Sequence, residues 1–592
     1  MQRCWLFYAQ WEWKEGPMIM EIFLWIVFFI VLTLVSPLLG KYMANVYEGN
    51  VISKWLSPIR FLERAVYKVL QVDETSEMNW KEYLYVLLFF NFVGFLVLVA
   101  TLLFQKYLPL NQYNIQNMRW DSALNAAVSF VTNTNWQSYS GETAATYFSQ
   151  MTGFALQNFL STATGMVVAV VLIRAFVRKN TIYVGNFYVD LVRSVLYILL
   201  PIAFMASIVL VSQGVIQNLS SYKTVYLLKP FLEGKNAVES YVLPMGPVAS
   251  QEAIKLLGTN GGGFFSANSA HPFENPTLFS NTFEAFLIIL IPASLVFTFG
   301  YMVKDKRQGW FLYAVTLFVL LSFVGGQYYF EMTGNPIINN LGVKGPYLIG
   351  KELRFGVGNS VLFSSITTAI ACGAVNSMHD SLTPIGGLVP MALMSLGEII
   401  FGGAGSGLYG MIAMVVVAVF VAGLMIGRTP EYLNKKIEAK EMWASVITIV
   451  TSGAIVLILS SFAFYTKWGV SSIKNPGPHG LSEILYAYIS TANNNGSAFA
   501  GLDASTVFYN LTTSLSMLLG RFIPIAAIMY MSGSLARKKH VAPSSGTLPT
   551  HTFVFGVWLV FVILIVGVLT FLPAFALGPI LEHILMLEGK IL

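Results

Sequence analysis

The sequence predicts an all-α membrane protein with ten transmembrane helices, eight of them arranged in four similar repeats. Hydrophobic residues make up 55% of the 592 positions and charged residues only 11%, whereas soluble domains carry about 25% charged residues. Mean hydropathy is +0.65. Ten apolar runs are long enough to cross a bilayer as helices, and four similar segments rich in Gly, Asn and Thr recur between them.

The ten apolar runs define the expected spans. Each contains about 20 apolar residues, the length that a helix needs to cross the hydrocarbon core, and the seventh run is about twice that length. The runs lie at 20–40, 84–104, 151–177, 191–213, 281–302, 310–330, 387–426, 442–465, 505–532 and 553–578.

Basic residues predict the orientation of these spans. Five alternate loops hold 20 of the 35 Lys and Arg residues, and every one of the five is basic: 41–83, 174–193, 303–309, 427–441 and 533–550. Cytoplasmic loops carry an excess of Lys and Arg. We therefore expect these loops in the cytoplasm of a bacterial cell, the chain in its inner membrane, and both termini outside.

The opposite-side segments between spans 2–3, 4–5, 6–7 and 8–9 share a pattern. Each contains an apolar stretch too short to span, such as 121–131 or 250–257, followed by Gly, Asn and Thr. Stretches of this length are candidates for re-entrant helices. Irregular backbone at membrane depth is tolerated only where it lines a water-filled cavity or is buried in protein, so the pattern predicts a pore.

The four segments form an internal repeat. They read VTNTNWQS (131–138), GTNGGGFF (258–265), ACGAVNSM (371–378) and TANNNGSA (491–498). If Asn133, Thr259, Cys372 and Asn494 are equivalent, each unit is a span, a re-entrant helix, a loop and a second span. The expected divisions are an N-terminal extension (1–19), a first span with its loop (20–83), four repeats (84–180, 190–303, 310–426 and 442–532) and a last span (553–578). Met1, Met18 and Met20 remain alternative starts.

The loop chemistry favours a large monovalent cation. Backbone carbonyls replace the water of such an ion without a fixed charge, and glycine permits the backbone angles that aim successive carbonyls at one axis. A calcium or magnesium site would want carboxylates, and the four loops contain none. A single loop of this composition is an ordinary turn. Four such loops, each following a short helix, predict four pore loops around one selectivity filter for potassium.

Long motifs across the chain resemble the KdpA family of bacterial potassium-transporting ATPases. They include FVTNTNWQSYSGE, LLGTNGGGFFSANSAHPFENP, FGGAGSGLYGM, GLMIGRTPEYL, NPGPHG and TANNNGSAFAGL. The resemblance implies a non-catalytic subunit that takes up external potassium and passes it through an intramembrane tunnel to KdpB, a P-type ATPase that binds ATP. It also implies KdpC and KdpF as partners and no organic cofactor.

The resemblance also implies which residues form the filter, by motif and position. In the first loop they are Asn133, Thr134 and Gln137, and in the second Thr259, Asn260 and Gly261. The third loop contributes Cys372 and Gly373, and the fourth Asn494, Asn495 and Gly496.

Four further features are candidates for a role below the filter. The glycines around Gly403 and Gly405 predict a break in the long seventh run, either as a mobile gate or for close packing of small residues. Glu398 and Arg521 are ionisable residues within spans, which are costly and usually paired, so we expect them to pair. Arg428 either discourages cations from leaking into the cytoplasm or simply anchors the loop.

Two other functions remain as alternatives. A stand-alone potassium channel or Trk/Ktr-like transporter would use the same filter. A membrane enzyme is disfavoured, because the sequence shows no clustered His/Cys/Glu metal set and no GxSxG or H-E-x-x-H motif, and K+ is the only metal ion that we expect. The chain also lacks the G-x-x-x-x-G-K-[ST] motif of ATP-binding loops. The chain has no DKTGT sequence either, so ATP must be split elsewhere.

Overall fold

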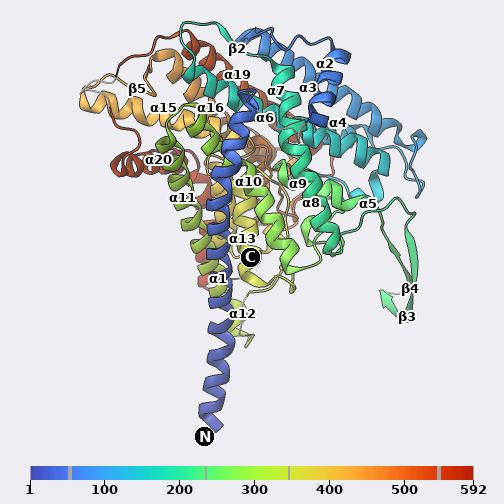
Figure 1. The fold of residues 1–592 in the computed structure, drawn as a ribbon. Coiled ribbons are helices and arrows are strands. Elements are labelled where there is room, and N and C mark those ends of the chain that lie inside the picture. Colours follow the sequence, from blue (N-terminus) through green and yellow to red (C-terminus); the bar gives the residue numbers. More distant parts are fainter. Residues whose placement is uncertain (1, 51–56, 234–235, 344–346, 543–547, 591–592) are drawn as a thin grey trace.

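The computed structural model describes residues 2–50, 57–233, 236–343, 347–542 and 548–590, and it is helical almost throughout (Figure 1). Ten helices in the described residues are long and apolar enough to span a membrane, which confirms the predicted number. They cover Ile19–Tyr47, Trp80–Tyr107, Ser149–Val177, Phe187–Ser212, Leu278–Met302, Lys306–Asn340, Ser406–Ile426, Ala439–Tyr465, Val507–Arg537 and Phe553–Leu587.

Four units repeat the same order of outer span, short helix, loop and inner span. The short helices, called pore helices below, are α4 (Trp120–Val131), α9 (Val248–Leu257), α13 (Gly356–Ala369) and α18 (Pro478–Ala492). The flanking spans are α3 (Trp80–Phe104) and α6 (Leu156–Val177), α8 (Leu200–Ser212) and α10 (Leu278–Met302), α11 (Lys306–Thr333) and α15 (Ser406–Ile426), and α16 (Ala439–Tyr465) and α19 (Val507–Arg537).

Helices α1 (Gln2–Tyr47) and α20 (Phe553–Phe575) lie outside the repeats, as predicted. Shorter helices complete the chain: α2 (Ser57–Leu70), α5 (Gly141–Ala144), α7 (Phe187–Arg193), α12 (Pro336–Asn340), α14 (Pro384–Ser395), α17 (Lys467–Val470) and α21 (Leu581–Leu587). Three antiparallel strand pairs join β1 (Met78–Asn79) with β2 (Tyr183–Gly185), β3 (Lys223–Glu233) with β4 (Asn236–Leu243), and β5 (Glu431–Tyr432) with β6 (Lys435–Lys436).

The core lies between the inner spans. The most apolar stretch of the span that contains α6 is 83% buried and that of α10 is 89% buried, against 17% for the span that contains α20. A helix that is apolar on all sides needs either protein or lipid around it. The inner spans therefore meet protein around the axis, while α20 presents large apolar side chains such as Phe561 and Leu569 outward.

The seventh predicted run is not one continuous helix. Helix α14 ends at Ser395, residues 396–405 form an irregular segment, and α15 begins at Ser406. Several residues of this segment have a positive φ, among them Glu398 (52°), Gly402 (63°) and Gly405 (97°). The predicted break at the glycines is confirmed, and α15 alone provides the span.

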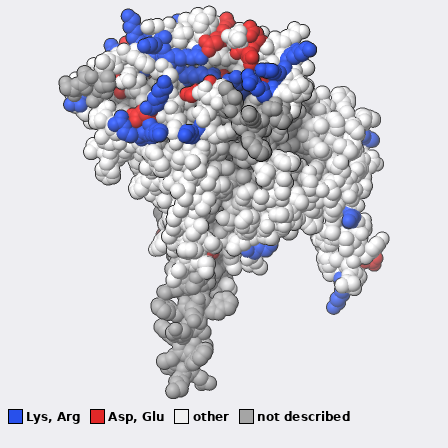
Figure 2. All heavy atoms as spheres, in the orientation of Figure 1, with Lys and Arg blue, Asp and Glu red and all other residues white. Residues whose placement is uncertain are grey.

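Charged side chains gather at one end of the molecule (Figure 2). Figure 1 places β2 and β5, from two of the basic loops, at this end, and the start of α1 at the opposite end. The β3–β4 hairpin also projects at the end away from the basic loops (Figure 1). The sequence analysis missed this hairpin, which follows the fourth span.

Candidate ion-binding filter

Every pore helix ends in the same turn. The second residue after each helix has a positive φ: Asn133 (68°), Thr259 (52°), Ala371 (54°) and Asn494 (58°). The next residue donates its backbone N–H to the carbonyl five residues earlier, in the pairs Thr134–Ser129, Asn260–Lys255, Cys372–Thr367 and Asn495–Ser490. The loops are therefore true structural repeats.

This turn corrects the predicted register of the third loop by one residue. Ala371, and not Cys372, is the equivalent of Asn133, Thr259 and Asn494. Non-glycine residues rarely adopt a positive φ, and Asn does so more readily than most. Alanine gives no such signal, so the sequence alone could not reveal that it occupies this position.

Amide side chains join the first loop to the second. Asn133 donates to the carbonyl of Thr259 (3.0 Å) and accepts from the side chain of Asn260 (2.6 Å). Gln137 donates to the carbonyl of Gly263 and accepts from its N–H, both at 3.0 Å. These predicted filter residues lie together, and they fix the first two loops against each other.

Close backbone approach joins the second, third and fourth loops. The N–H of Gly373 donates to the carbonyl of Asn260 (3.1 Å). A Cβ at Gly373 would lie 2.7 Å from the carbonyl oxygen of Asn495, and a Cβ at Gly261 would overlap the backbone of Gly373. Glycine is required at both positions because no side chain fits between the loops.

The fourth loop returns to the first. Asn494 donates to the hydroxyl of Thr134 (3.0 Å), and a Cβ at Gly496 would overlap the carbonyl of Thr134. The contacts therefore run from loop 1 to 2, 3, 4 and back to 1. The predicted filter residues all lie in the four loops that this ring joins, although the hydrogen bonds of Cys372 in the described residues go to Thr367 on its own pore helix.

The ring offers carbonyl oxygens and no charged side chain. Among the described residues, no donor reaches the carbonyl oxygens of Asn133, Thr134, Asn494 or Asn495, so these oxygens are free for another partner. The Cys372 side chain is fully buried. Such a ring suits a monovalent cation that sheds its water.

Hydroxyl groups on the pore helices form hydrogen bonds with the backbone of the loops that follow them. The sequence analysis did not identify these residues. Ser129 donates to the carbonyl of Trp136 (3.0 Å), and Thr367 donates to the carbonyls of Cys372 and Ala374. Ser490 accepts from the N–H of Gly496 (2.9 Å). In three of the four pore helices, the residue whose carbonyl accepts the turn's backbone hydrogen bond is therefore a Ser or Thr. This recurrence is a signal that the sequence did contain.

The irregular segment (396–405) lies directly against the filter loops. The N–H of Ala404 donates to the hydroxyl of Thr259 (2.9 Å). A Cβ at Gly403 would contact the side chain of Ala371 at 3.1 Å, and one at Gly405 would overlap the carbonyl of Gly165 on α6. Both predicted gate glycines therefore pack closely, and the segment touches the second and third loops.

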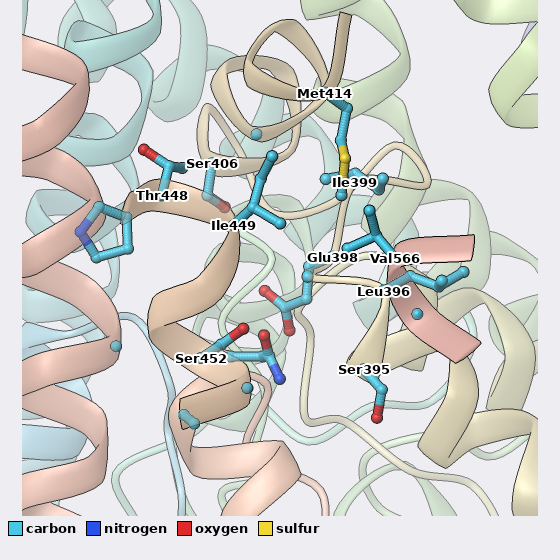
Figure 3. Close-up of a pocket in the computed structure, with 18 of the residues that line it drawn as sticks. Ser395, Leu396, Glu398, Ile399, Ser406, Met414, Thr448, Ile449, Ser452 and Val566 are labelled. Atoms are coloured by element: carbon cyan, nitrogen blue, oxygen red, sulfur yellow. The ribbon is translucent and has the colours of Figure 1, made fainter. Parts of the chain in front are cut away.

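A cavity of about 70 Å³ extends between this segment, α15, α16 and α20 (Figure 3). That is room for a few water molecules. Glu398 and Arg521 both line it, together with Asn494 of the filter. Figure 3 shows the Glu398 carboxylate pointing into this cavity, near Ser452.

The predicted direct pairing of Glu398 with Arg521 is not seen. Within the described residues the two make no ion pair, and Arg521 donates instead to the carbonyl of Ser161 (3.1 Å). One Glu398 oxygen is buried without a hydrogen-bond partner. The two side chains line the same cavity but do not contact each other. Arg428 is exposed in the loop after α15, away from the filter ring.

Comparison with known proteins identifies the family. A family model described as "KdpA: Potassium-transporting ATPase A subunit" matches residues 26–584. The chain belongs to the KdpA family. The match covers all four filter loops, the part of α1 from residue 26 on, and α20, as the resemblance of the motifs implied.

Relatives of this KdpA family chain are similar over nearly their full length. A potassium-transporting ATPase potassium-binding subunit of Hydrogenobaculum sp. is 74% identical over 96% of this chain and 99% of its own. The same-named protein of Geotalea uraniireducens is 55% identical over 95% and 98%. The solved structure of the potassium transporter TrkH from Vibrio parahaemolyticus aligns with a TM-score of 0.47 and 12% identity, over 83% of this chain and 97% of that chain.

Proposed function

We propose that this chain is the potassium-binding subunit of an ATP-driven potassium uptake system. The closed ring of four unlike loops is the single observation that carries the proposal. It offers unpaired carbonyl oxygens, contains no charged side chain, and is built within one member of the KdpA family. The names of the similar proteins agree with this role.

Potassium would enter from the end opposite the basic loops. Cytoplasmic loops are the basic ones, so the end with the β3–β4 hairpin would face outward. The ion would lose its water in the ring and then meet the irregular segment (396–405), which lies against the loops. The cavity lined by Glu398 and Arg521 would be the first part of the exit route towards the ATPase subunit, KdpB. KdpC and KdpF would complete the complex.

A stand-alone Trk/Ktr-like channel is the second candidate. The ring itself fits either function, because selectivity needs no energy source. The packing of residues 396–405 against the loops favours a subunit that holds the ion until a partner takes it. The sequence contains no ATP-binding loop motif, so a pump would need a partner chain.

Co-purification tests the assembly. The full chain, expressed with its neighbouring subunits, should be isolated together with a P-type ATPase whose ATP hydrolysis rises with potassium. Isolation of the chain alone, together with potassium flux in liposomes without ATP, would support the channel and refute the pump.

Gly261→Asp tests the ring. A side chain at this position overlaps the backbone of Gly373 and adds a charge, so apparent potassium affinity should fall by about 100-fold or more. Gly342→Asp is the matched control, because Gly342 also has a positive φ (89°) but a Cβ there meets nothing within 4 Å. Unchanged affinity in Gly261→Asp would contradict the filter assignment.

A further inference from the structure

A cluster of one histidine and three carboxylates lies outside the filter. Asp380 belongs to the turn after the third loop, His479 and Glu483 to the start of α18, and Glu582 to α21. His479 and Glu483 are four residues apart, so they lie on the same face of the helix. The three segments are far apart in sequence and meet only here.

The donor atoms are close enough to share one ion. The Nε2 atom of His479 lies 3.0 Å from a carboxylate oxygen of Asp380. Ligand atoms of Asp380, His479 and Glu483 all lie within 4.8 Å of one another. Oxygen ligands bind zinc at about 2.0–2.2 Å, so two oxygens on one zinc ion are somewhat closer to each other than 4.8 Å. Small side-chain rotations would bring these three groups to that separation.

The fourth carboxylate orients the imidazole. The Nδ1 atom of His479 lies 2.9 Å from Glu582, and a proton on Nδ1 leaves the lone pair of Nε2 directed towards Asp380 and Glu483. Histidines that bind metals almost always donate their other N–H to a carboxylate or carbonyl in this way. Glu582 therefore has the geometry of an outer partner rather than a ligand.

The charge of the cluster is unbalanced. Glu483 is fully buried, and its hydrogen-bond donors among the described residues are Asn475 (2.6 Å) and the N–H of Lys474 (3.3 Å). No Lys or Arg of the described residues forms an ion pair with Asp380, Glu483 or Glu582. Three carboxylates with one imidazole remain net negative, and buried negative charge is costly unless a cation balances it.

The site is also reachable. An open cavity of about 390 Å³ is lined by Asp380, His479 and Glu582, and His479 is 17% exposed. His479 begins α18, about 20 Å along the helix from the fourth filter loop at 1.5 Å per residue. An ion could thus enter without passing the filter.

We propose that Asp380, His479 and Glu483 form a binding site for a first-row divalent metal ion of the zinc class, with Glu582 orienting His479. An imidazole among carboxylates selects zinc-like ions over magnesium or calcium, which prefer oxygen ligands alone. A bound ion would fix the start of the fourth pore helix to the turn after the third loop. Without a metal, the carboxylates of Asp380 and Glu582 hold the imidazole of His479 between them.

Zinc titration of the purified full complex, stripped with a chelator, tests the site. Calorimetry and elemental analysis should find one zinc ion per chain at micromolar concentration or below. His479→Asn and Asp380→Asn should weaken binding by at least 30-fold, and Glu582→Gln by about tenfold, the effect usual for an outer partner.

His583→Asn is the matched control, because His583 is next to Glu582 on α21 but packs edge-to-face against the ring of Phe330 and forms no hydrogen bond or ion pair within the described residues. Each variant should retain potassium-stimulated ATP hydrolysis as evidence of folding. Cobalt provides a second readout, since its visible absorption should appear with the parent chain and disappear with His479→Asn. Absence of stoichiometric zinc binding, or binding that His479→Asn and Asp380→Asn leave unchanged, would overturn the proposal and leave only the ion-paired imidazole.

Discussion

The filter ring and the irregular segment (396–405) are both non-helical backbone among spanning helices, yet they are held very differently. Every filter loop bonds to its neighbours through amide side chains, backbone groups or close glycine contacts. In the irregular segment, the backbone N–H groups of residues 398–403 have no hydrogen-bond partner among the described residues. Only Ala404 bonds to the filter.

This difference separates two tasks. An unpaired buried polar group costs about 1–3 kcal/mol, so a segment with several of them gains by moving to another arrangement. Segments of low local stability are the ones that open first. A ring that discriminates between ions must hold its shape, whereas a barrier that releases ions must not. Substitutions in the ring should therefore change affinity, and substitutions in the segment should change rate.

Gly373→Ala should have the largest effect. Its new Cβ would lie 2.7 Å from the carbonyl oxygen of Asn495, and backbone on both sides leaves no room for adjustment. We expect potassium affinity, measured by stimulation of ATP hydrolysis, to fall by about 100-fold or more. Gly325→Ala is the control, because nothing lies within 4 Å of a Cβ there. Equal affinity in the two variants would mean that the ring is not rigid.

Gly405→Leu should act on rate rather than on affinity. The leucine would displace the irregular segment from Gly165, and a Cβ alone would lie 2.7 Å from the N–H of Met166. Potassium transport should slow by about tenfold with affinity changed less than about threefold. Gly427→Leu has a similar positive φ but open space around its Cβ, so its rate should be near that of the parent. A change in affinity without a change in rate would reverse the assignment of tasks.

Asn133→Ala should have a moderate effect on affinity. It removes the hydrogen bonds to the second loop and leaves the carbonyl of Thr259 and the side chain of Asn260 with fewer partners. A loss of about 1.5–2 kcal/mol corresponds to roughly 10- to 30-fold weaker potassium binding. Discrimination between potassium and sodium should weaken in parallel. Asn114→Ala, at an exposed position that also has a positive φ (55°), should change neither.

Thr259→Val should have the smallest effect and sharpen the boundary between the two regions. The exchange keeps the shape but removes the hydroxyl that accepts from Ala404. One such hydrogen bond contributes about 1 kcal/mol, so transport rate should change by a few-fold. Thr333→Val, an exposed threonine at the end of α11, is the control. If rate and affinity both stay constant, the contact does not link the ring to the segment.

Much of this architecture could be predicted because lipid imposes simple rules. Ten apolar runs gave ten spans, and glycine runs located the break after α14. The register of the third loop could not be read, because Ala371 adopts a positive φ only under the constraint of its neighbours. The β3–β4 hairpin was not predicted, because apolar runs reveal membrane spans and not strands outside the membrane. Glu398 and Arg521 do not pair because of the directions of their side chains, which cannot be predicted from their positions in the sequence.

The link between Asn494 and Thr134 spans 360 residues of one chain. A ribosome adds roughly 5–20 residues per second, so the first loop waits on the order of 20–70 s for the residue that completes its ring. No partial chain can therefore present a finished filter, and a truncated product should not conduct potassium selectively. Fusing four repeats in one chain delays closure of the ring until the fourth loop has been synthesised.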